Sequence, residues 1–157
     1  MQQSHLAAMS KVFSVYHIVI NTYCRRMTIP SSQKRALYSY INAIAVNKSC
    51  KILRINGIDN HIHILLKLAP TVALSSLVQE VKRCSSMWMH NNPNFPMFES
   101  WGKDYFAMSI NPSIMESVEK YIDGQESHHT RRKLEEELKE MCLRMGIEWR
   151  DCFLADD

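Results

Sequence analysis

Hydrophobic positions along this chain follow two periods, and the order in which the periods alternate predicts a mixture of strands and helices. Stretches rich in Val, Ile and Tyr, or with an apolar residue at every second position, indicate strands. Apolar residues spaced three or four apart indicate helices. The strand-like stretches cover residues 12–22, 51–58, 60–68 and 105–110, and helical stripes cover residues 37–45, 74–88, 114–125 and 134–145. The predicted order is therefore β-α-β-β-α-β, followed by two helices.

This order predicts an α+β fold of the ferredoxin-like type. Short connections and right-handed crossovers give an antiparallel sheet backed by two helices, with two extra helices at the C-terminus. The first and third strands are central in that topology. We expect residues 1–157 to form a single domain with a substantial core, and residues 1–11 to be a dispensable extension because Met9 offers an alternative start.

The third predicted strand carries the most informative chemistry of the chain. It reads N-H-I-H-I-L-L-K-L at residues 60–68. Alternation places His61 and His63 on the face opposite the isoleucines, roughly 6–7 Å apart at the backbone. Two imidazoles at that spacing can bind one divalent metal ion, although two polar residues on a half-exposed strand are the plainer alternative. We expect a metal here to lie on an open sheet surface, across which a long substrate can bind.

A third ligand and a reacting group are available on a later helix. Tyr121 and Gln125 are four residues apart and share one helical face. The alternative role for Tyr121 is packing, because it continues the apolar stripe of Ile114 and Val118. A tyrosine hydroxyl has a pKa of about 10 and is a poor nucleophile unless its electrophile is activated.

A divalent ion bound to a phosphodiester supplies that activation. The product is a phosphotyrosine link that keeps the energy of the broken bond, so strand cutting and rejoining need no ATP. Imidazole and amide ligands suit Mn²⁺ better than Mg²⁺, but phosphate oxygens and water in the remaining positions make either ion workable.

Composition narrows the classes of function. With 46% hydrophobic residues, four Gly and five Pro, the chain is typical of a compact globular protein. It contains no G-x-x-x-x-G-K, G-x-G-x-x-G or G-x-S-x-G pattern, so we expect no nucleotide cofactor and no serine hydrolase activity. Five cysteines without C-x-x-C spacing are typical of reduced thiols. We find no signal peptide or membrane span and expect a cytoplasmic protein.

The charge pattern permits a polyanionic partner. The net charge is +3, and basic residues cluster at 25–26, 82–83 and 131–133. Such clusters can contact phosphates, although each is also compatible with an ordinary solvated face. The candidate DNA contacts are Lys82, Arg83, Arg131 and Arg132.

Several motifs together resemble the single-tyrosine transposases of the HUH superfamily, which include the insertion-sequence TnpA type and relatives associated with repeated extragenic palindromes. The matching text is Y-H-I-V at 16–19, N-H-I-H-I-L-L at 60–66, S-I-N-P-S at 109–113, V-E-K-Y-I-D-G-Q-E-S-H-H at 118–129 and G-I-E-W at 146–149. The resemblance covers nearly the whole chain from about residue 12. The histidine pair combined with the Tyr-x-x-x-Gln helix is the specific part.

The resemblance implies a role for each of these residues. His61, His63 and Gln125 are expected to bind Mg²⁺ or Mn²⁺, and Tyr121 to be the nucleophile of a strand transferase. The implied substrate is single-stranded DNA with a hairpin near the ends of a mobile element, cleaved to a 5′-phosphotyrosine and a free 3′-hydroxyl. The implied assembly is a homodimer in which each tyrosine helix completes the neighbour's metal site. The expected dimer contacts are the sheet edge and the C-terminal helices, with the apolar stripe at 134–145.

Two departures from the family pattern stand out. Gly124 lies where relatives often carry a side chain, and glycine inside a helix costs about 1 kcal/mol relative to alanine. Asp104 replaces a frequent glycine before Tyr105. The competing hypothesis is a non-catalytic module that binds single-stranded nucleic acid, or an inactive domesticated relative. Such a module would present aromatic side chains where this chain presents histidines.

Overall fold

The protein folds as a four-stranded antiparallel sheet with helices on both faces. The computed structural model describes residues 11–128 and 133–156. The strands are β1 (Val15–Asn21), β2 (Lys51–Ile58), β3 (His61–Lys67) and β4 (Phe106–Ser109), in the spatial order β2-β3-β1-β4. The helices are α1 (Lys34–Asn47), α2 (Leu74–His90), α3 (Met115–Asp123), α4 (Gln125–His128) and α5 (Leu134–Met145). The predicted ferredoxin-like order, with β1 and β3 central, is confirmed.

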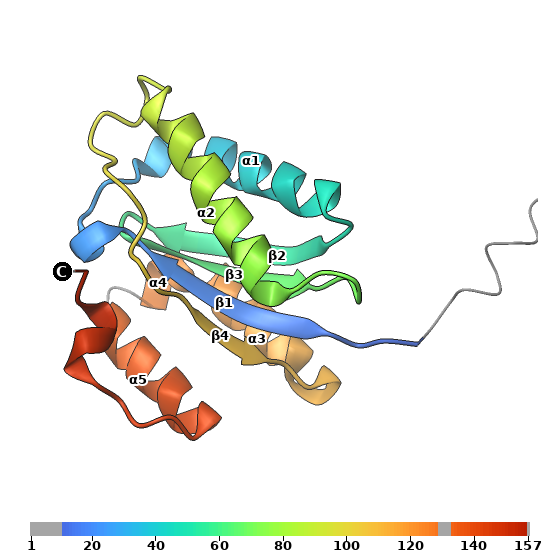
Figure 1. Ribbon diagram of the computed structural model, residues 1–157. Coiled ribbons are helices and arrows are strands. Elements are labelled where there is room, and N and C mark those ends of the chain that lie inside the picture. The colour runs from blue at the N-terminus through green and yellow to red at the C-terminus, as the bar shows by residue number, and fades with distance from the viewer. Residues whose placement is uncertain (1–10, 129–132, 157) are drawn as a thin grey trace, which may run out of the picture.

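The first face of the sheet is covered by α1 and α2 (Figure 1). The main core lies in this layer, where buried isoleucines and leucines of β1 and β3 meet the apolar stripes of both helices. Ile62, Ile64 and Leu66 all point into it, as strand alternation predicts. The residues between them therefore point to the second face.

The second face is also covered, which corrects the expected open sheet surface. His61 and His63 are both 0% exposed. The physical reason is that this face also carries apolar residues, among them Val19 and Leu65, which require their own cover. Helix α3 packs against β2 and β3, and α5 packs beside β4 (Figure 1). The histidines are enclosed together with these apolar neighbours.

Helix α5 uses its apolar stripe within its own chain. Leu134, Leu138 and Met141 are buried against Val19 and Phe106. The suggestion that this stripe forms a dimer contact is therefore wrong, because its surface is already covered. The helix ends at Gly146, whose φ of 69° lies in the left-handed region that glycine adopts without steric cost. Among the described residues, no helix has the length and apolar character needed to cross a membrane.

The helix expected to carry both Tyr121 and Gln125 is divided. Helix α3 ends at Asp123, Gly124 forms a turn, and Gln125 begins α4. The Gly124 amide still donates to the Lys120 carbonyl at 3.1 Å, so the break is local. At the other end, the Asn111 side chain accepts a hydrogen bond from the Ser113 amide and begins the preceding turn, as the Asn-Pro-Ser sequence predicts.

Candidate active site

Strand β3 places the two histidines at the centre of the sheet. Their ring centroids lie 5.1 Å apart, with the rings edge to face. His63 is opposite Val19 of β1, and His61 is opposite Asn21. The backbone of β3 is hydrogen-bonded to β1 on one side and to β2 on the other. This pairing fixes the backbone positions from which the two imidazoles project.

Each imidazole is oriented by a hydrogen bond on its Nδ1 side. His61 Nδ1 lies 2.7 Å from the side-chain oxygen of Asn60. An amide oxygen only accepts, so a proton on His61 Nδ1 satisfies this contact and leaves the Nε2 lone pair for a metal ion. His63 Nδ1 lies 2.7 Å from His17 Nε2. The arrangement matches metal-binding histidines, whose second nitrogen usually donates to a neighbouring acceptor.

His17 comes from β1 and was not among the predicted site residues, although it stands in the matched Y-H-I-V text. Burial, reinforced by the neighbouring His63, lowers the pKa of His17 to about 3. Its ring is therefore neutral near pH 7, and its Nε2 can accept the hydrogen bond from His63 Nδ1. His63 then also presents the lone pair of Nε2 to the interior of the site.

A carboxylate that the sequence analysis missed meets both histidines. Glu137 of α5 is 2% exposed, and its Oε2 lies 3.6 Å from the Nε2 atoms of both His61 and His63. One signal was present in the sequence. Glu137 shares the helical face of Leu134, Leu138 and Met141, where a charged residue inside an apolar stripe is unusual.

Gln125 and Tyr121 complete the cluster. The Gln125 Oε1 atom lies 3.4 Å from His61 Nε2, and its Nε2 donates to Glu137 Oε1 at 3.4 Å. The Tyr121 hydroxyl donates to the same Glu137 oxygen. All four residues predicted for the site are therefore brought together with Glu137, from β3, α3, α4 and α5 of one chain.

The separation of these donor atoms fits a divalent metal ion. Ligand atoms of His61, His63 and Glu137 all lie within 4.8 Å of one another. When two ligand atoms each lie about 2.1 Å from one ion, neighbouring positions of an octahedron are about 3.0 Å apart. In a tetrahedron the two ligand atoms are about 3.4 Å apart. The 3.4–3.6 Å separations are close to these values, but the 4.8 Å limit for the whole set is wider, so the side chains must move closer together to bind an ion.

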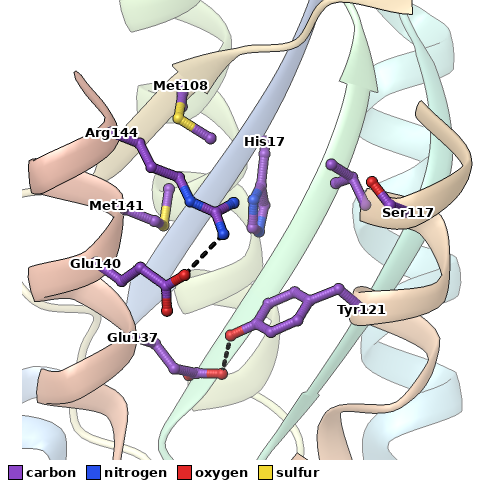
Figure 2. Close-up of a pocket in the computed structure, with 9 residues that line it drawn as sticks. His17, Met108, Ser117, Tyr121, Glu137, Glu140, Met141 and Arg144 are labelled. Atoms are coloured by element: carbon purple, nitrogen blue, oxygen red, sulfur yellow. Dashed lines mark hydrogen bonds and ion pairs between the residues drawn. The ribbon is translucent and has the colours of Figure 1, made fainter. Parts of the chain in front are cut away.

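A cavity of about 340 Å³ leads to this cluster between α3 and α5. Figure 2 shows Tyr121 and Ser117 on one side, Glu140 and Arg144 on the other, and His17 behind them. The Arg144 guanidinium is paired with Glu140 at 2.7 Å. The cavity is near the lower end of the volume range of ligand pockets, about 300–1,000 Å³.

Comparison with known proteins gives the family. The model of the family described as "Transposase IS200 like" matches residues 11–125. The chain belongs to this family of IS200-like transposases. It is 26% identical over 115 residues to the transposase of insertion sequence element IS200 from Salmonella typhimurium strain LT2, covering 70% of this chain and 75% of that relative. It is 20% identical over 117 residues to the ISDra2 transposase TnpA of Deinococcus radiodurans, covering 70% and 82%.

The fold of this IS200-like transposase also matches solved relatives. A REP-associated tyrosine transposase bound to a REP hairpin superimposes with a TM-score of 0.60 at 17% identity, covering 77% of this chain and 73% of that one. The likeness supports the same fold. The family match includes His61, His63, Tyr121 and Gln125 but ends at Gln125, so Glu137 lies beyond it.

Two of the predicted DNA contacts, Lys82 and Arg83, lie away from this site. Lys82 and Arg83 are on α2, across the sheet from the histidines. The Lys82 ammonium donates to the carbonyls of Gly102 and Asp104 at 2.8 and 2.7 Å, so it holds the loop before β4. Arg83 is 57% exposed at its side chain and pairs with Glu80. Arg131 and Arg132, the other two predicted contacts, fall outside the described residues.

Proposed function

We propose that this IS200-like transposase cleaves and rejoins single-stranded DNA with Tyr121 as the nucleophile. The proposed metal ligands are His61, His63 and Gln125, and the proposed ion is Mg²⁺ or Mn²⁺. One observation carries the proposal. The hydroxyl of Tyr121 and the donor atoms of the three ligands converge on one buried cluster, and they do so within a single chain.

The reaction follows from the position of the hydroxyl. The Tyr121 oxygen attacks the phosphorus of a DNA phosphodiester, and an oxygen–phosphorus bond forms while the hydroxyl proton passes to a neighbouring base. The bond from phosphorus to the 3′ oxygen of the preceding nucleotide breaks, and that oxygen leaves as a 3′-hydroxyl after taking up a proton. A bound divalent ion withdraws charge from the phosphate. Attack by a 3′-hydroxyl on the phosphotyrosine reverses the step and rejoins the strand.

Access to the site is proposed to run through the cavity between α3 and α5. Tyr121 is the site residue that is partly exposed there, whereas both histidines and Gln125 are fully buried. A phosphate entering this cavity meets the Tyr121 hydroxyl and the guanidinium of Arg144. Glu137, which contacts both histidines, also lines this cavity, so the cavity extends to the proposed metal ligands.

We propose that the substrate strand carries a hairpin, since the solved relative of this fold is bound to a REP hairpin. Arg83 remains a proposed phosphate contact on the opposite face. A homodimer also remains a proposal, but the described site does not require one, because Tyr121 of the same chain donates to Glu137, which lies beside both histidines. Light scattering of the active protein tests the dimer independently of cleavage.

The test is formation of a covalent protein–DNA adduct. The full chain is incubated with hairpin-containing single-stranded DNA from the ends of its own element and with Mn²⁺, and the products are separated under denaturing conditions. Wild type and Tyr40→Phe are expected to form the adduct, while Tyr121→Phe is expected to bind DNA without forming it. Tyr40 is a suitable control because it stacks on Trp88, on the first face of the sheet. DNA binding without any wild-type adduct would favour the non-catalytic alternative.

A further inference from the structure

Building on the proposed strand-transfer function, we propose that Glu137 links the nucleophile to the metal. One carboxylate oxygen, Oε2, is a fourth ligand of the ion held by His61 and His63. The other, Oε1, holds the hydroxyl of Tyr121 and accepts its proton when the tyrosine oxygen bonds to phosphorus. The residue thus acts from a helix that lies beyond the family match.

The two oxygens of this carboxylate face different groups. Oε2 is equidistant, at 3.6 Å, from the Nε2 atoms of His61 and His63. Oε1 accepts hydrogen bonds from the Tyr121 hydroxyl and from the amide nitrogen of Gln125. This contact fixes the Gln125 amide with its oxygen toward His61. With Oε1 engaged by Tyr121 and Gln125, three kinds of metal-ligand atom lie close together: imidazole nitrogen, amide oxygen and carboxylate oxygen.

Because the Glu137 carboxylate is buried, we expect a cation to bind beside it. The Glu137 side chain is 1% exposed, and an ionised carboxylate removed from water needs compensation by an opposite charge or by hydrogen bonds. A divalent ion bound by Glu137 together with the histidines would supply such an opposite charge.

The carboxylate also explains how the site suits a hard ion. Two imidazoles and one amide lack the carboxylate oxygen that Mg²⁺ and Mn²⁺ prefer. Glu137 supplies the missing oxygen ligand and a negative charge. We therefore expect its removal to weaken Mn²⁺ binding more than Zn²⁺ binding, because Zn²⁺ is well served by histidines.

The test measures metal binding without DNA. Full-length wild type, Glu137→Gln and Glu135→Gln are titrated with Mn²⁺ by calorimetry, and Mn²⁺ electron paramagnetic resonance counts the bound ion. Glu135 is a matched control on the same helix, paired with Lys139 on the surface. We expect Glu137→Gln to weaken Mn²⁺ binding by at least about 10-fold. Removing a residue that only hydrogen-bonds to a metal ligand already costs about that much affinity. Glu135→Gln is expected to stay within about 2-fold of wild type.

A second variant covers the case in which Glu137→Gln does not fold. Glu137→Asp keeps the charge but withdraws the carboxylate by one methylene, so it should bind Mn²⁺ with intermediate affinity and form adduct more slowly than wild type. Wild-type affinity and adduct rate in a folded Glu137→Gln or Glu137→Asp variant would overturn the inference. Unchanged Mn²⁺ binding with faster adduct formation would also overturn it, because α5 would then be only a cover over the site.

The outcomes separate this inference from the proposed function. If wild type neither binds Mn²⁺ nor forms an adduct, the strand-transfer function itself fails. If wild type does both and Glu137→Gln matches it in both, only the role of Glu137 fails. Support for the inference requires that wild type binds Mn²⁺ and forms adduct, while Glu137→Gln binds Mn²⁺ at least about 10-fold more weakly and forms adduct more slowly.

Discussion

Replacing Asn60 should weaken metal binding without touching a metal ligand. The Asn60 side-chain oxygen lies 2.7 Å from His61 Nδ1 and is the acceptor that keeps the His61 proton on that nitrogen. In Asn60→Ala the imidazole loses this partner and can rotate or change tautomer, so its Nε2 lone pair is no longer fixed toward the site. Loss of such a partner typically costs 10–100-fold in metal affinity, or about 1.4–2.7 kcal/mol.

The assay is Mn²⁺ calorimetry on wild type, Asn60→Ala, Asn60→Asp and a distant control, Asn91→Ala. Asn60→Asp keeps an acceptor for His61 Nδ1 and is expected to bind Mn²⁺ within about 3-fold of wild type. Asn91 caps the exposed end of α2 and should have no effect on Mn²⁺ affinity. Wild-type affinity in a folded Asn60→Ala protein would refute the reasoning, since the Nδ1 hydrogen bond would then not control the ligand nitrogen.

Three further predictions concern stability and charge. Mn²⁺ at 100 times its Kd should stabilise wild type by about 2.7 kcal/mol. Chelation of the ion, or the variant His63→Ala, should remove that stabilisation. A metal-dependent melting shift in His63→Ala would count against His63 as a ligand. Leu138→Ala should lower the free energy of unfolding by about 2–5 kcal/mol because Leu138 is 0% exposed. Chemical denaturation tests this, and Leu143→Ala, at an exposed position of the same helix, should change it by less than about 0.5 kcal/mol. Arg144→Ala should flatten the slope of log affinity against log salt for single-stranded DNA by about 0.7, and an unchanged slope would remove Arg144 as a phosphate contact.

The strands and the helical stripes were predictable because local periodicity reports which side of an element is apolar. The range predicted for β2 matches the structure, and the isoleucines of β3 point into the first core layer as expected. The same alternation correctly set His61 and His63 apart from that layer. These are properties of single elements, and the sequence of each element contains them.

The sequence did not predict what covers the second face. Periodicity shows that α5 has an apolar stripe, but not which surface that stripe will contact. The stripe of α5 is equally suited to a partner subunit, but Leu134 and Leu138 pack on Val19 and Phe106 of the same chain. Glu137 was missed for the same reason, because its role depends on where α5 lies. Glycine has low helix propensity, so the sequence indicated a weak point at Gly124. It did not show that the helix would break there.

The central claim is that the Tyr121 hydroxyl becomes bonded to DNA. Digestion of the purified covalent adduct, followed by peptide mass analysis, identifies the modified residue among the six tyrosines. The account predicts a nucleotide attached to the peptide that contains Tyr121, because this tyrosine alone of the six donates to Glu137 beside the histidine pair in the described part of the chain. Attachment to any other tyrosine, or an adduct of wild-type yield in Tyr121→Phe, would contradict it.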